Sequence, residues 1–148
     1  MSTLVLQLES TIDTASKRIK LLSDIDTRPQ PSKWSKKEIL GHLCDSGTVN
    51  HKRFVNILTS KESITITGYN QELWVQAHNY QRSFSSDEIL QLWQSINKQI
   101  IKLLTNVKDA QWQLPCKTEE QNIVTFEWLV TDYIDHMDHH LKQIFADY

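Results

Sequence analysis

Two histidines, His136 and His140, stand four residues apart in a segment with a helical pattern. Each residue of a helix advances about 100°, so the apolar residues of this segment form a stripe at roughly 60° to 140° from His136. His140 lies at about 40°, beside the stripe, whereas His139 lies at about 300° and is expected to face solvent or the border of a site. Two imidazoles on one helix face can both bind a metal ion, and they need a third ligand from elsewhere.

His42 is the candidate for that third ligand. It stands at the edge of an apolar stripe in an earlier predicted helix, and Ser46, Asn50 and Arg53 continue a polar column on the same side. A polar column that adjoins the core of a helical bundle is typical of an internal site. Three neutral imidazoles leave a coordination position open, as catalytic metal sites do and closed structural sites do not.

A structural explanation of the same residues stays open. Histidine pairs at this spacing also arise by chance, and neutral histidines can lie in a core with satisfied hydrogen bonds. The aspartates nearby, Asp132, Asp135 and Asp138, can simply pair with them. We interpret His51 and His78 as surface or loop residues. The five tryptophans are interpreted as core and rim packing rather than as part of a cofactor site.

Four stretches carry apolar residues at spacings of three and four, which predicts amphipathic helices. The apolar face of the first is Leu4, Leu8, Ile12, Ala15, Ile19 and Leu22. Two prolines within residues 28–31 then end it. The second helix is expected to begin after Ser35, where Glu38 completes a capping box and Trp34 and Ile39 occupy the positions of a hydrophobic staple.

A long connection is predicted over residues 60–84, with a short helical turn near 72–77 and a strand fragment as an alternative at 64–67. Ser85 or Ser86, together with Glu88, is expected to cap the third helix. Its predicted apolar face is Ile89, Leu92, Trp93, Ile96, Ile100, Leu103 and Leu104. A second connection precedes the fourth helix, which is expected to run from near residue 125 to about residue 145.

The composition favours one all-α domain over residues 1–148, a four-helix bundle with a long connection between helices two and three. The chain has only three glycines and three prolines in 148 residues, so structure breakers are scarce. Its net charge of −2 argues against nucleic acid as a partner. Isolated Cys44 and Cys116, without a signal peptide or a membrane-spanning segment, indicate a cytoplasmic protein that does not bind a membrane.

The segment Trp34–Phe54, with its WSKKEILGHLCDS run, resembles the DinB-like superfamily and especially its YfiT-type branch of metal-dependent hydrolases. The segment His136–Ile144 is similar to that family's C-terminal histidine signature. The resemblance implies an up-down-down-up bundle, often dimeric, that binds one divalent metal ion in an open cleft. Position by position, His42, His136 and His140 match the ligands, and His139 matches a residue beside the site.

Other residues are expected to border this cleft. Asp45 or Asp132 can orient the second nitrogen of a ligand ring, and Ser46, Asn50, His139 and Gln143 are further candidates at its border. Tyr69 and Trp74 are expected to line the cleft, in a segment where relatives often carry acidic residues.

Imidazole ligands suit zinc, nickel, iron or copper; we expect zinc or nickel, with iron or manganese as alternatives. Such an ion lowers the pKa of bound water or of a bound thiol toward neutral pH, so that a nucleophile forms there. Two reactions on a small molecule follow: hydrolysis of an amide or ester, and transfer of a low-molecular-weight thiol, which the resemblance favours slightly. A non-catalytic stress-response binding protein and a structural oligomerisation module remain alternatives. The amphipathic helices carry more aromatic residues than the core of one bundle requires, so a homodimer is the expected assembly.

Overall fold

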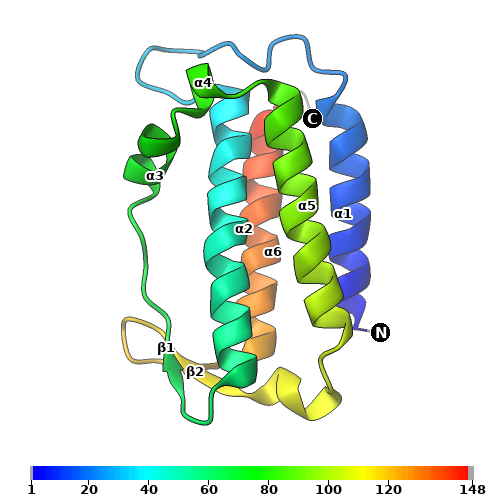
Figure 1. The fold of residues 1–148 in the computed structure, drawn as a ribbon, viewed down its shortest axis with the longest axis vertical. Coiled ribbons are helices and arrows are strands. Elements are labelled where there is room, and N and C mark those ends of the chain that lie inside the picture. The colour runs from blue at the N-terminus through cyan, green and yellow to red at the C-terminus, as the bar shows by residue number, and fades with distance from the viewer. Residues whose placement is uncertain (1, 147–148) are drawn as a thin grey trace.

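Four long helices form a bundle in the computed structural model, which describes residues 2–146 (Figure 1). They are α1 (Thr3–Ile19), α2 (Lys36–Thr59), α5 (Ser86–Thr105) and α6 (Phe126–Ile144). In the view of Figure 1 the chain runs up in α1, down in α2 and α5, and up again in α6. The predicted all-α bundle and its up-down-down-up order are therefore confirmed.

Side-chain caps set where the helices begin. The Ser35 hydroxyl accepts the Glu38 backbone N–H at 3.1 Å, and the Glu38 carboxylate accepts the Ser35 N–H at 3.1 Å. Ser85 and Glu88 repeat this capping box at the start of α5. Such a cap typically stabilises a helix by about 1 kcal/mol. Both predicted capping boxes are confirmed, and Ser85, rather than Ser86, is the cap of α5.

The connection between α2 and α5 is a crossover, because these two helices run in the same direction. It contains β1 (Ile64–Thr65), α3 (Gln71–His78) and α4 (Tyr80–Ser83). In Figure 1, α3 lies beside α2, outside the four-helix bundle, and both α3 and α4 pack against α2. The helical turn predicted near 72–77 is confirmed as α3, and the strand alternative at 64–67 is confirmed as the short β1.

A small sheet closes one end of the bundle. After the 3-10 helix η1 (Asp109–Gln113) come β2 (Pro115–Lys117) and β3 (Ile123–Thr125). β1 pairs in parallel with β2 at Ile64–Cys116, and β2 pairs antiparallel with β3 at Cys116–Val124. The second predicted connection is thus partly ordered by backbone hydrogen bonds. Thr125 ends this sheet and accepts the Trp128 N–H, so that α6 begins where predicted.

The bundle core is aromatic at its centre. Phe54, Trp93, Phe126 and Tyr133 are almost fully buried there, among aliphatic side chains from all four long helices. The prediction that Leu92 lies on the buried face of α5 is wrong, because Leu92 is 39% exposed while its neighbour Leu90 is buried. The reason is that α5 packs against both α1 and α2, which turns its buried face toward Leu90. No helix within residues 2–146 is both long and apolar enough to cross a membrane.

Candidate metal centre

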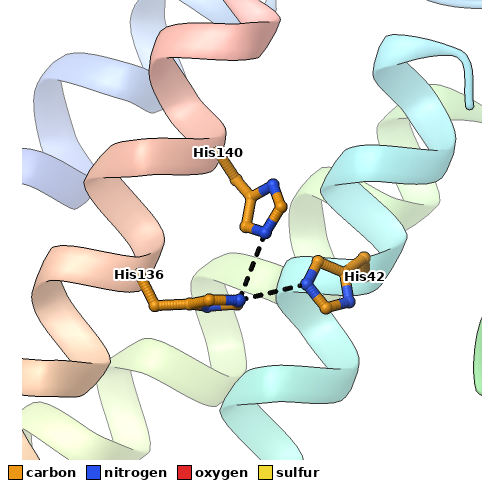
Figure 2. Close-up of side chains that lie close together, drawn as sticks. All are labelled: His42, His136 and His140. Atoms are coloured by element: carbon orange, nitrogen blue, oxygen red, sulfur yellow. Dashed lines mark hydrogen bonds between the residues drawn. The ribbon is translucent and has the colours of Figure 1, made fainter. Parts of the chain in front are cut away.

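Three imidazoles from α2 and α6 converge on one point in the bundle (Figure 2). His136 Nε2 lies 3.3 Å from His42 Nε2 and 3.2 Å from His140 Nε2. One nitrogen from each ring falls within 4.8 Å of the other two. His42 is fully buried, whereas His136 and His140 are partly buried. The three histidines named from sequence spacing therefore form one cluster.

The two helices position these rings for simple reasons. His136 and His140 are one turn apart on α6, which places their rings on the same face. The buried side of that helix, with Tyr133, Met137 and Leu141, packs into the core and holds the histidine pair at its edge. α2 packs against α6, so that His42 meets the pair from the opposite side. His139 is exposed, as predicted.

Burial keeps the cluster uncharged near neutral pH. Desolvation, followed by the proximity of His140 and His136, lowers the pKa of His42 to about 3. Desolvation and the charges of His140 and His139 likewise lower the pKa of His136 to about 4. The pKa of His140 is also lowered, first by burial. Neutral imidazole is the form that binds a metal ion.

Two polar side chains hold the outer nitrogens of the α6 histidines. Gln143 Oε1 lies 2.8 Å from His140 Nδ1, and because an amide oxygen only accepts, Nδ1 carries the hydrogen. The lone pair of His140 is then on Nε2, which faces the cluster. Ser46 Oγ lies 3.5 Å from His136 Nδ1 and itself accepts from the Asn50 amide. The candidates Gln143, Ser46 and Asn50 thus border the cluster.

The prediction that Asp45 orients a ligand ring is wrong. Its Oδ1 accepts a 2.6 Å hydrogen bond from the Tyr80 hydroxyl and lies 3.2 Å from His78 Nδ1. The reason is that Asp45 points toward α3 and α4, away from α6. The outer nitrogen of His42, Nδ1, is buried and has no hydrogen-bond partner within the described residues.

Asp132 is likewise not brought to the cluster. It is exposed on α6 and lines a surface hollow with Arg53 and Trp128. His51 lies within α2 and not in a loop, and it is partly exposed, which agrees with its interpretation as a surface or loop residue.

Three residues at the site were missed by the sequence analysis. Trp34 lies against His42 with ring centroids 5.2 Å apart, and it closes one side of the cluster. Tyr80 and His78 both contact Asp45. No local pattern predicts the contacts of Tyr80 and His78 with Asp45, because both residues belong to the crossover, whose packing against α2 joins distant parts of the chain.

Two of the three nitrogen separations in the cluster match those around a tetrahedral ion. Ligand distances of 2.0–2.1 Å for zinc and imidazole place two ligating nitrogens roughly 3.3 Å apart. The two short separations in the cluster are 3.3 and 3.2 Å. The residues present therefore fit a divalent ion held by three imidazoles.

Fold and site together define an up-down-down-up helical bundle with a three-histidine cluster between its second and last helices. A sequence model of the DinB superfamily matches residues 7–144. The chain belongs to the DinB superfamily.

A curated relative is the Bacillus subtilis (strain 168) protein named "Putative metal-dependent hydrolase YfiT". It is 26% identical over 123 residues, which cover 82% of this chain and 68% of the relative. The solved structure of Bacillus subtilis YfiT, described as "a probable metal-dependent hydrolase with an unusual four-helix bundle topology", is also similar, with a TM-score of 0.82. The match covers 99% of this chain and 87% of that one at 22% identity, and it shows the shared fold.

Proposed function

We propose that this protein is a metal-dependent enzyme that acts on a small molecule, with one divalent ion held by His42, His136 and His140. The observation that carries the proposal is the convergence of three neutral imidazoles, two pairs of which have the nitrogen spacing found around a tetrahedral ion. The relative named as a metal-dependent hydrolase supports the same class of chemistry.

A bound divalent ion supplies Lewis-acid activation of water or of a thiol near neutral pH. The reaction is hydrolysis of an amide or ester, or transfer of a small thiol to an electrophile. The protein's own residues prepare this site by burial, which keeps the imidazoles neutral, and by the contacts of Gln143 and Ser46, which fix two of the rings. Trp34 packs against the buried ring of His42.

The first experiment is elemental analysis of the full chain purified without a histidine tag. We expect close to one equivalent of zinc or nickel in the wild type and its loss in His136→Ala. The matched control is His139→Ala, which removes an exposed histidine beside the cluster and keeps the metal. A wild-type protein that binds no divalent ion, with circular dichroism showing a folded bundle, would contradict the proposal.

Assays of the metal-loaded protein then separate the two reactions. One series offers a thiol with an electrophile, and the other offers amide and ester substrates. Turnover in either series that depends on both the metal and His136 is the expected result. A fully loaded protein that turns over no substrate in either series is instead a metal-binding protein without this activity.

A further inference from the structure

The outer nitrogen of His42 differs from those of the other two histidines in the cluster. His136 Nδ1 lies 3.5 Å from the hydroxyl oxygen of Ser46. His140 Nδ1 lies 2.8 Å from the amide oxygen of Gln143. His42 Nδ1, in contrast, is buried and has no hydrogen-bond partner among residues 2–146. In metal sites the outer nitrogen of a histidine ligand is usually hydrogen-bonded, which fixes the orientation of the ring. The ring of His42 therefore needs a different contact to fix its plane.

Rotation of the His42 ring about its Cβ–Cγ bond decides where the lone pair of Nε2 points. This bond joins an sp³ carbon to an sp² carbon, so its energy wells are broad and do not define the ring plane by themselves. Nε2 is the nitrogen that faces the cluster, 3.3 Å from His136 Nε2 (Figure 2). A ring that turns about this bond directs its lone pair away from the point on which the other two imidazoles converge.

The indole of Trp34 packs against this ring at a shallow angle. The two ring centroids are 5.2 Å apart, and the planes are tilted by 37°. The rings of His136 and His140 meet the same imidazole nearly at right angles, at 74° and 78°. Of these three neighbours, Trp34 has the plane closest to parallel with that of His42. A large, rigid ring in this arrangement leaves a fully buried imidazole little space in which to turn.

The backbone beside Trp34 is held by the capping box at the start of α2. Ser35, the next residue, is fully buried, and its hydroxyl accepts the Glu38 N–H and donates to Gln81 Oε1 at 2.6 Å. The Ser35 N–H donates to the Glu38 carboxylate, which Arg28 also binds through two nitrogens at 2.8 and 2.9 Å. This network fixes the chain next to Trp34, so that the indole can hold a neighbouring ring in place.

Trp112 makes a matched contact elsewhere in the bundle. Like Trp34 it is partly buried, and its ring centroid lies 5.5 Å from that of Phe126 at a tilt of 46°. Phe126 is as fully buried as His42. Loss of either tryptophan removes a comparable aromatic contact, but Trp34 packs on a histidine of the cluster and Trp112 on a phenylalanine. The pair therefore separates an effect on the metal centre from an effect on packing.

We propose that Trp34 is a positioning residue for the metal centre: its indole fixes the plane of the His42 ring and so directs the Nε2 lone pair toward the ion. Because this ion is the one assigned above to His42, His136 and His140, the positioning role rests on the proposed function. The three rings of the cluster are then oriented by three kinds of contact, with a hydroxyl, an amide and an indole.

The test measures the zinc affinity of the full-length chain by competition with a chromophoric chelator. Trp34→Leu should weaken zinc binding by about tenfold or more, as loss of a group that orients a metal ligand typically does. Trp34→Phe keeps an aromatic ring and should recover part of this affinity. Trp112→Leu, the matched control, should bind zinc as the wild type does. Equal losses of affinity in Trp34→Leu and Trp112→Leu would assign the effect to packing and overturn the proposal.

The visible spectrum of bound cobalt(II) separates ring orientation from stability. At saturating cobalt(II), the absorption bands depend on the geometry of the ligands and not on how tightly the chain is folded. We expect these bands to shift in Trp34→Leu and to keep their wild-type positions in Trp112→Leu. Urea unfolding of the metal-free variants measures the loss of stability of each. Bands that stay unchanged in Trp34→Leu would contradict a positioning role.

A metal-free measurement keeps this test distinct from that of the proposed function. In the ¹⁵N-labelled full-length chain, long-range ¹H–¹⁵N NMR correlations should show one sharp set of signals for the His42 ring. Trp34→Leu should broaden or average them, and wild-type signals in the folded variant would overturn the proposal. Trp34→Met, whose flexible side chain offers no rigid plane, takes its place if Trp34→Leu does not fold. Failure of the proposed function shows instead as a wild type that binds no ion, which leaves the NMR result decisive.

Discussion

At the scale of single residues, burial rather than a neighbouring charge sets the chemistry of the cluster. Desolvation is the largest cause of the lowered pKa of all three histidines. A nearby carboxylate would favour the protonated ring and so compete with a metal ion. The fold instead directs Asp45 toward Tyr80, which keeps its charge away from the ring of His42.

The metal-free protein should lose stability as the pH falls below about 6.5. The unfolded chain binds protons at His42 and His136 near their ordinary pKa of 6.5, but the folded chain binds them only near 3 and 4. Acid therefore favours unfolding across this window, by at most about 1.4 kcal/mol per pH unit for each histidine. Urea unfolding at pH 7.0, 6.0 and 5.0 measures the slope.

His42→Gln removes one of these titrations and should reduce the slope by the share of one histidine. The stability of the His42→Gln variant at pH 7 is measured in the same series. This value separates a general loss of packing from the change in pH dependence. Equal stability of the metal-free wild type at pH 7.0 and 5.0 would contradict the expectation.

Tyr133→Phe should destabilise the protein by about 1–3 kcal/mol, because it leaves a buried acceptor without its donor. The Tyr133 hydroxyl donates to Asn97 Oδ1 at 2.6 Å, and both side chains lie in the core. Tyr69→Phe is the matched control and should have little effect on stability, because the Tyr69 hydroxyl has no partner within residues 2–146. Urea midpoints that fall equally in both variants would be inconsistent with this account.

At the scale of helices and strands, the position of Asp45 depends on how closely the crossover approaches α2. A Cβ atom added at Gly41 would overlap the ring of Tyr80, whose hydroxyl holds Asp45. The glycine thus allows α4 to lie against α2. The same contact keeps the Asp45 carboxylate engaged on its α4 side.

Gly41→Ala should be destabilising by about 1–2 kcal/mol although alanine is the better helix former. Alanine gains about 1 kcal/mol of helix propensity, but overpacking costs typically 1–3 kcal/mol and here also displaces the Tyr80 hydrogen bond. Gly68→Ala is the control, because its new Cβ would meet the nearest atom, of Glu119, at an ordinary 3.4 Å. Thermal and urea unfolding compare the two, and a stabilised Gly41→Ala protein would refute the argument.

The long helices and the pair His136 and His140 could be predicted from the sequence because their signals are local, whereas His42 is assigned from the polar column on its helix and the family resemblance. Ser35 with Glu38, and the spacing of His136 and His140, each lie within one or two helical turns. The strands Pro115–Lys117 and Ile123–Thr125 could not be predicted, because three residues are too few to show the alternation of apolar and polar residues that marks a strand. The partners of Asp45 could not be predicted either, since Tyr80 and His78 reach it only through the packing of the crossover.

At the scale of the whole molecule, a metal ion would join α2 to α6. Zinc at 100 times its dissociation constant should add about 2.7 kcal/mol to the free energy of unfolding, which corresponds to a rise in Tm of roughly 5–10 °C. His136→Ala should show no zinc-dependent rise, whereas His51→Ala, on α2 outside the cluster, should keep it. Thermal scans with zinc and with a chelator measure both, and equal Tm values in the two conditions for the wild type would contradict the expectation.

The 94 residues that separate His42 from His136 have a consequence during protein synthesis. A nascent chain that ends before α6 holds one imidazole of the three and has no partner for it from the same polypeptide. The centre is therefore completed only when the ribosome has released His140 and α6 has docked.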